Sequence, residues 1–240
     1  MINTTKSFAV FDIDGTIFRS GLYREAVYEL LAANQIPKTV SKSFESLELN
    51  WKKRQSDLAF KEYENAMAYA MDDILPQIRI KDFEAAANRV FKRLSDYVYV
   101  YTRGLVEELK QKGYTLIAIS GSQDELVRPF AEKYGFDIWI GQKYERGDEF
   151  YTGKIIKSHD GKDVILKKII DEHNLSLVGS IAVGDSYGDI GILSIVDHPI
   201  AFNPTKELFE VAHKKGWRVV IERKNMIYEL ESHGKSYILA

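Results

Sequence analysis

The sequence predicts an α/β fold: a doubly wound core of parallel strands, with a helical cap inserted after the first strand. Three short apolar runs, at 8–11, 116–119 and 181–183, support this prediction, because each runs into small and polar residues. Runs of this length between turn residues are typical of buried strands in a parallel sheet. Since substrates of open α/β sheets bind at the carboxyl edge, we expect the three run ends to be neighbours and to form one site.

The first strand ends in two carboxylates. Asp12 and Asp14 follow Phe11 and are separated by one residue. Side chains two positions apart on a strand share a face, and Gly15 allows a sharp turn directly after them. An Asp-x-Asp-Gly string alone is also typical of an ordinary turn. The polar residues that end the other two apolar runs strengthen the case that this pair belongs to a functional site. Paired carboxylates at a sheet edge suit phosphoryl transfer.

A long insertion follows the first strand. About a hundred residues separate the first two apolar runs, far more than a simple crossover needs. The segment 22–94 is rich in helix-forming residues, with Ala26 and Leu30 at helical spacing and breaks at Pro37 and Pro76. This pattern predicts a helical cap, and a lid of this kind excludes water from a reaction.

The predicted division of the chain follows from the insertion. Residues 1–16 and 101–240 form the α/β core, and residues 17–100 form the cap. Within the core, turn residues predict a β-excursion between 140 and 156, and residues 217–222 are expected to form a further strand.

The second and third run ends carry further polar groups. Ser120 and Gly121 follow the second run, and Asp185 and Asp189 follow the third, with glycines that allow a tight turn. Four aspartates that converge without a counter-ion would repel one another and could not all stay ionised. The cluster therefore implies a bound hard cation with oxygen ligands, for which Mg²⁺ is the first choice.

Lys162 is the candidate cationic partner for a phosphate. Ile165, Leu166, Ile169 and Ile170 form an apolar stripe at helical spacing, and Lys162 extends this stripe by one turn. The lysine is therefore expected to point inward. A lysine in a first helical turn also opposes the helix dipole, and such a local conflict is expected where function requires it. The alternative is an ordinary surface lysine that snorkels.

Together these residues resemble the four motifs of the haloacid dehalogenase (HAD) superfamily, and the resemblance covers nearly the whole chain. The matching residues are, in order, Asp12, Asp14, Gly15 and Thr16, then Ser120 and Gly121, then Lys162, then Gly184, Asp185 and Asp189. The nearest branch is the phosphoserine-phosphatase-like group, subfamily IB. The resemblance implies a Rossmann-like core with a cap inserted after the first motif.

The resemblance also implies roles for individual residues. Asp12 is the nucleophile, Asp14 is the general acid and base, and Lys162 neutralises charge. Ser120 and the Gly121 amide bind the phosphate.

The resemblance further implies a Mg²⁺ site. Asp12, the Asp14 backbone carbonyl and Asp185 would hold the ion, with Asp189 bound directly or in the second coordination sphere. Independently of the family, an aspartate that attacks phosphorus splits a very slow hydrolysis into two easier displacements.

We therefore expect a Mg²⁺-dependent phosphatase that hydrolyses a small phosphomonoester through an aspartyl-phosphate intermediate. Transfer of the phosphate to a second alcohol stays open as an alternative. A non-enzymatic phospho-receiver module is a further alternative, although the cap and Asp14 argue against it. Superfamily dehalogenases resemble this chain but lack an acid at position 14.

The substrate is less well defined by the sequence. Phosphoserine phosphatases carry a glutamate shortly after the first motif to hold the substrate amine, but the matching position here is Gly21, and the nearest following acid is Glu25. This departure predicts a small phosphorylated metabolite other than phosphoserine. Candidate contacts, each equally explained as a solvated helix side chain, are Arg19, Arg24, Lys61 and Tyr63.

Composition limits the class of protein. A net charge of −2 and a pI of about 6.2 argue against nucleic acid as the main partner. The chain has no cysteine, which excludes disulfides. Neither a signal sequence nor an apolar run long enough to cross a membrane is evident. We therefore expect a cytoplasmic enzyme without membrane partners, and the sequence does not indicate the oligomeric state.

Overall fold

The structure is a computed structural model that describes residues 6–156, 161–234 and 236–239, so residues 1–5 of the predicted core lie outside it. Its sheet has nine strands in the order β4-β3-β2-β1-β5-β6-β7-β8-β9. The strands are β1 (Lys6–Phe11), β2 (Thr115–Gln123), β3 (Ile138–Arg146), β4 (Tyr151–Ile156), β5 (Leu175–Gly184), β6 (His198–Phe202), β7 (Arg218–Arg223), β8 (Met226–His233) and β9 (Ser236–Leu239). From β3 to β7 all neighbours are parallel, and β4, β8 and β9 add antiparallel edges.

Strand β1 occupies the centre of the sheet between β2 and β5. Phe11, its last residue, pairs with Ala118 of β2 and with Val183 of β5. The three predicted strand ends are therefore neighbours at one edge, as the sequence indicated.

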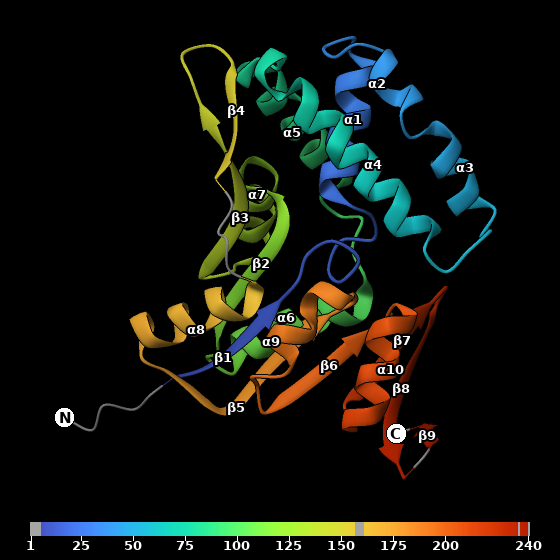
Figure 1. Ribbon diagram of the computed structural model, residues 1–240. Coiled ribbons are helices and arrows are strands. Elements are labelled where there is room, and N and C mark those ends of the chain that lie inside the picture. Colours follow the sequence, from blue (N-terminus) through green and yellow to red (C-terminus); the bar gives the residue numbers. More distant parts are fainter. Residues whose placement is uncertain (1–5, 157–160, 235, 240) are drawn as a thin grey trace.

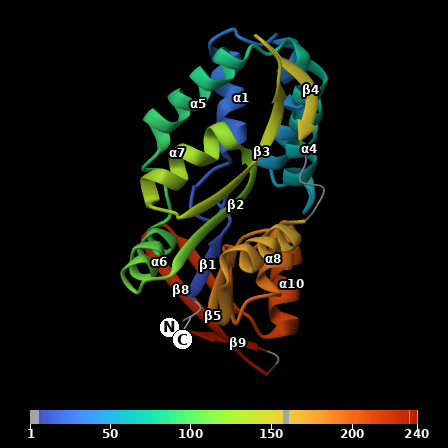
Figure 2. The ribbon, with the colours of Figure 1, turned by 90° about the vertical axis from the view of Figure 1, so that its left-hand side faces the viewer.

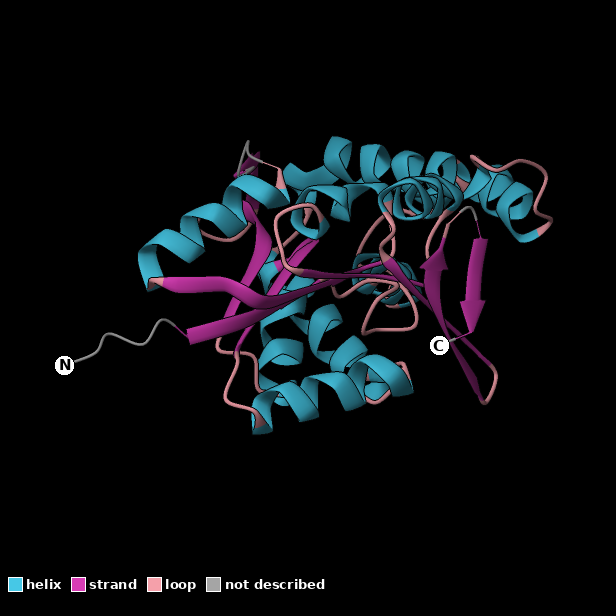
Figure 3. Cartoon of the chain, turned by 90° about the horizontal axis from the view of Figure 1, so that it is seen from below, coloured by secondary structure: helices cyan, strands magenta, loops and turns pink. Residues whose placement is uncertain are grey.

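Helices cover both faces of the sheet (Figures 2 and 3). One layer contains α6 (Val100–Gln111) and α7 (Asp124–Tyr134), and the other contains α8 (Lys162–His173), α9 (Ile190–Leu193) and α10 (Lys206–Lys215). Successive side chains of β1 point to opposite layers: Ala9 and Phe11 pack with α6 and α7, and Phe8 and Val10 pack with α8 and α9. The doubly wound α/β fold is confirmed.

Apart from the short 3-10 helix η2 (Tyr187–Asp189), which follows β5, the remaining helices lie beyond the carboxyl edge of the sheet (Figure 1). They are α1 (Leu22–Ala32), α2 (Thr39–Lys42), α3 (Glu45–Lys52), α4 (Ala59–Ile74), the short 3-10 helix η1 (Leu75–Gln77) and α5 (Ile80–Leu94). As the sequence indicated, Pro37 separates α1 from α2, and Pro76 falls in η1. None of the helices in the described ranges combines the length and hydrophobicity that a membrane crossing requires.

The β3–β4 hairpin reaches this helical layer. Its turn residue Glu149 accepts a hydrogen bond from the Ile80 amide at 3.0 Å, and the Tyr151 amide donates to the Ile78 carbonyl at 3.2 Å. The division at residues 17–100 stays a prediction, and these two bonds join the hairpin to the helices.

Candidate active site

Lys162 joins two carboxylates at the carboxyl edge of the sheet. Its Nζ lies 2.6 Å from Asp12 Oδ1 and 2.7 Å from Asp189 Oδ1. The inward direction expected from the apolar stripe is observed, because α8 begins at Lys162 and packs Leu166 and Ile169 against the sheet. Burial lowers the pKa of Lys162, but Asp12 and Asp189 outweigh it and hold the pKa above its usual value. The lysine therefore keeps its charge.

Asp12 is almost fully buried, with 4% of its surface exposed. Burial raises its pKa to about 7, an effect that Lys162 opposes and that Asp189 and Asp14 reinforce. The Asp12 amide still donates to the Val183 carbonyl, at 3.0 Å. The nucleophile predicted from the resemblance is thus held against the central strands, with one carboxylate oxygen on Lys162.

Asp14 faces a different set of partners. Its Oδ2 accepts hydrogen bonds from Ser120 Oγ at 2.7 Å and from Ser122 Oγ at 2.8 Å, and its Oδ1 accepts from the Leu22 amide at 2.5 Å. Asp12 and Asp14 both lie just beyond β1, which ends at Phe11, and the turn follows at 15–17, as Gly15 indicated. Both side chains still reach one cavity.

Asp189 is fully buried, and both its carboxylate oxygens accept hydrogen bonds. Besides Lys162 on Oδ1, its Oδ2 accepts from the amides of Asp185 and Ser186 at 3.1 and 3.0 Å and from Ser186 Oγ at 3.0 Å. These bonds hold the loop after β5 in a tight turn and orient Lys162. Asp189 therefore supports its neighbours, whether or not it also contacts an ion.

Asp185 provides the test of a metal site. One oxygen each of Asp12, Asp185 and Asp189 lies within 4.8 Å of the others. Among the described residues, none forms a hydrogen bond or ion pair with the Asp185 side chain. Burial, with repulsion from Asp12 and Asp189, raises the pKa of Asp185 well above its usual value. An enclosed carboxylate without a partner, close to a second carboxylate, matches the oxygen donor set of Mg²⁺.

Two glycines shape the space around these groups. A Cβ on Gly15, whose φ is +80°, would lie 2.1 Å from Asp185 Oδ2, so only glycine permits this close approach. A Cβ on Gly121 would meet no atom within 4 Å. The chain is therefore tight on the carboxylate side and open at Gly121, where the resemblance places a phosphate.

A cavity of about 500 Å³ lies over the carboxylates and extends beneath the helices beyond the sheet edge. Of the predicted site residues, Asp12, Asp14, Gly121, Lys162 and Asp185 line it. Ser120 lines an adjoining cavity of about 520 Å³ that shares Gly121 and Lys162 with the first. Asp189 does not line either of these two cavities.

The structure adds residues that sequence reasoning missed. Ser122 bonds Asp14, and Trp51, Phe60 and Glu64 line the cavity from the helical layer. Ser122 had a signal, since it continues the polar end of the second apolar run. The other three had none, because helical spacing does not reveal which surface of an inserted helix faces a site 50 residues away.

The candidate substrate contacts divide into two groups. Arg19 and Arg24 line the cavity. Tyr63 is buried and its hydroxyl lies 2.7 Å from that of Tyr28, while Lys61 is exposed and lies outside the cavity lining. Glu25 pairs with Arg93 at 3.2 Å instead of facing the site.

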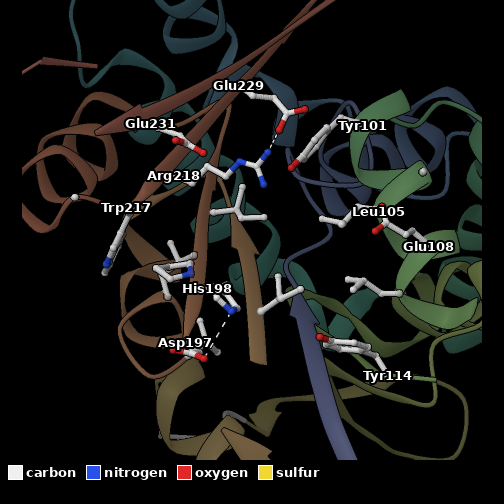
Figure 4. Close-up of a pocket in the computed structure, with 18 of the residues that line it drawn as sticks. Tyr101, Leu105, Glu108, Tyr114, Asp197, His198, Trp217, Arg218, Glu229 and Glu231 are labelled. Atoms are coloured by element: carbon white, nitrogen blue, oxygen red, sulfur yellow. Dashed lines mark ion pairs between the residues drawn. The ribbon is translucent and has the colours of Figure 1, made fainter. Parts of the chain in front are cut away.

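A cavity of about 1150 Å³ lies elsewhere, between α6 and strands β6 to β8 (Figure 4). Two ion pairs lie in its wall, Arg218 with Glu229 and His198 with Asp197. In the ranges that the structure covers, the cluster of three acids that could hold a metal belongs to the Asp12 site and not to this cavity. The smaller cavity at the carboxyl edge is thus the candidate active site.

The comparison with known families agrees with this geometry. A model of the haloacid dehalogenase-like hydrolase family matches residues 9–194. The chain belongs to this family. The match spans most of β1, the helical layer, β2, α8 and the loop after β5, which carry the residues of the candidate active site.

Individual relatives of this HAD hydrolase are phosphatases. It is 24% identical over 231 residues to a histidinol-phosphatase of Neisseria meningitidis serogroup C (strain 8013), over 90% of this chain and 98% of that protein. It is 25% identical over 206 residues to a phosphoserine phosphatase of Methanocaldococcus jannaschii, over 82% of this chain and 85% of the relative. These relatives and the family make the chain an enzyme of the phosphatase class, as the sequence predicted, and not a phospho-receiver module.

Solved structures show the same fold. A phosphoserine phosphatase solved as a phospho-aspartyl intermediate analogue superposes with a TM-score of 0.63 at 22% identity, over 92% of this chain and 95% of that one. The predicted Rossmann-like HAD core is confirmed.

Proposed function

We propose that this HAD hydrolase is a Mg²⁺-dependent phosphatase that cleaves a small phosphomonoester through an aspartyl-phosphate on Asp12. The observation that carries the proposal is the position of Lys162 between Asp12 and Asp189, at 2.6 and 2.7 Å. A fixed ammonium beside the nucleophile offsets the repulsion between a carboxylate and an approaching phosphate.

The reaction needs two displacements. In the first, an Asp12 oxygen forms a bond to phosphorus, the ester P–O bond breaks, and Asp14 gives a proton to the leaving alkoxide. In the second, Asp14 takes a proton from water, the water oxygen bonds phosphorus, and the bond to Asp12 breaks to release phosphate. The bonds from Ser122 and the Leu22 amide hold Asp14 in one orientation for both steps.

The phosphate binds beside Gly121, where the space is open. The Gly121 amide donates to one of its oxygens, and the Ser120 hydroxyl exchanges its bond to Asp14 for a bond to another. Asp12 and Asp185 would hold Mg²⁺, with Asp189 as a buried support for Lys162 and for the Asp185 loop. When bound, the ion stabilises charge on the transferring phosphoryl group.

A small substrate fits the cavity of about 500 Å³. The relatives act, by name, on histidinol phosphate and phosphoserine. At Gly21 this chain lacks the glutamate expected of a phosphoserine phosphatase, and Glu25 turns away toward Arg93. We infer that the substrate is a different small phosphomonoester. The test is to rank a panel of phosphorylated metabolites by kcat/KM. A kcat/KM for L-phosphoserine more than about tenfold above that of every other compound would contradict the inference.

The decisive experiment follows Asp12. Hydrolysis of an aryl phosphate with Mg²⁺ is expected in the parent protein, to fall to background in Asp12→Asn, and to stay at the parent rate in Asp171→Asn, an exposed carboxylate on α8. Acid quenching with labelled substrate should trap phosphate on the parent only. Undiminished turnover by Asp12→Asn would refute Asp12 as the nucleophile, and full activity after exhaustive chelation would refute the dependence on a metal ion. Added glycerol distinguishes transfer from hydrolysis.

A further inference from the structure

Arg24 of α1 is held rigidly at the far wall of the cavity. Its guanidinium lies over the rings of Trp51 and Phe60, at 5.2 and 5.7 Å from their centroids, and Nη2 donates to Ser20 Oγ at 2.8 Å. Only 13% of the side chain is exposed. The other terminal nitrogen, Nη1, is enclosed and makes no hydrogen bond, so a ligand in the cavity cannot reach it.

Glu64 of α4 is the accessible member of the pair. Its Oε1 lies 3.6 Å from Arg24 Nη1, and 47% of its side chain is exposed although it lines the cavity. Burial raises the pKa of Glu64 to about 7, Arg24 opposes the rise, and Asp14 adds to it. The charge that Glu64 can present to a substrate is negative, and an ammonium group beside it would favour this charged form. The carboxylate lies within electrostatic reach of Asp14, the acid that protonates the leaving group.

We propose that Glu64 determines specificity by binding a cationic nitrogen of the substrate, so that the enzyme prefers phosphomonoesters of amino alcohols, with Arg24 as the residue that positions Glu64. This inference rests on the proposed function and names its substrate class.

Charge and access both favour a cation here. A partly enclosed carboxylate gains more from an ammonium group than from a neutral hydroxyl, because charge-assisted hydrogen bonds are about twice as strong. An anionic group in the same place would meet Glu64 and Asp14, while the free nitrogen of Arg24 stays out of reach. The nitrogen must also lie close to the ester oxygen, since Asp14 and Glu64 face one small cavity.

The test compares two esters of nearly equal size, 2-aminoethyl phosphate and 2-hydroxyethyl phosphate. The parent is expected to prefer the amine by at least tenfold in kcat/KM, and Glu64→Gln to bring this ratio close to one. Glu62→Gln is the matched control, because Glu62 is exposed on the same helix and lies outside the cavity lining. It should keep the parental ratio.

A second variant tests the positioning role. Arg24→Met should lower the ratio mainly through KM for the amine, and Arg24→Lys should restore part of it, whereas a purely structural role would change both esters equally. A parental ratio near one, or an equal loss on both esters in Glu64→Gln, would overturn the inference.

Failure of the proposed function gives a different result, namely no Asp12-dependent hydrolysis of either ester. Calorimetric binding to Asp12→Asn then decides the inference by itself: tighter binding of the amine, lost in Asp12→Asn/Glu64→Gln, supports it, and equal dissociation constants refute it.

Discussion

Gly15→Ala should disable the site by moving one carboxylate. The new Cβ would lie 2.1 Å from Asp185 Oδ2, so the carboxylate must retreat by more than about 1 Å, and a misplacement of that size can cost about 100-fold in rate. The left-handed backbone adds about 1–2 kcal/mol of strain, which lowers Tm by about 2–8 °C in a chain of this size.

Gly113→Ala separates these two effects. Gly113 has the same φ of +80°, but a Cβ there meets no atom within 4 Å. We expect both variants to lose similar Tm without metal. Only Gly15→Ala should lose the rise in Tm with millimolar Mg²⁺ and about 100-fold in kcat/KM for an aryl phosphate. A Gly15→Ala protein that keeps the parental response to Mg²⁺ and matches Gly113→Ala in activity would refute the crowding argument.

Two further predictions concern the buried acids. The pKa of Asp12 is raised to about 7, and that of Asp185 is also raised. The folded protein without metal therefore binds these protons more tightly than the unfolded chain does. The resulting stability is fully present below about pH 4 and is lost as the pH rises through about 7. Urea unfolding in chelator should show the free energy of unfolding falling across this window while stabilisation by Mg²⁺ grows; a flat profile in both would count against it. In Asp189→Asn, the side-chain NH₂ group must face either Lys162 or the donors that now bond Oδ2. We expect the free energy of unfolding to fall by about 3–5 kcal/mol and Tm by about 6–20 °C. The exposed control Asp171→Asn should lose less than about 0.5 kcal/mol. A loss below about 1 kcal/mol in Asp189→Asn would show that its bonds are replaceable.

Local pattern was sufficient for the frame of the site. Asp12, Ser120 and Asp185 each follow a short apolar run, and parallel strands necessarily bring such ends to one edge of a sheet. The helical stripe in α8 likewise oriented Lys162, because a period of 3.6 residues defines a face without reference to the rest of the chain.

Other contacts depend on packing between distant segments. Ser122 reaches Asp14 across 108 positions of sequence, and the β3–β4 hairpin joins helices that precede it by about 70 residues. Alternation along β1 could not predict how Asp12 and Asp14 lie, because both follow its last residue and a pattern along one strand cannot show where that strand stops.

The sequence by itself determined the fold class and the family, and it predicted the acids and lysine of the candidate site, since these depend on strand ends and helix faces that are local properties. Only the tertiary structure decided which members of those groups pair, that both oxygens of Asp189 are bonded by its neighbours, and that Glu64 instead of Arg24 is the accessible charge on the far wall. The physical reason is that access and pairing depend on which surfaces of α1 and α4 meet over the sheet edge, and periodicity within each helix leaves that meeting undefined.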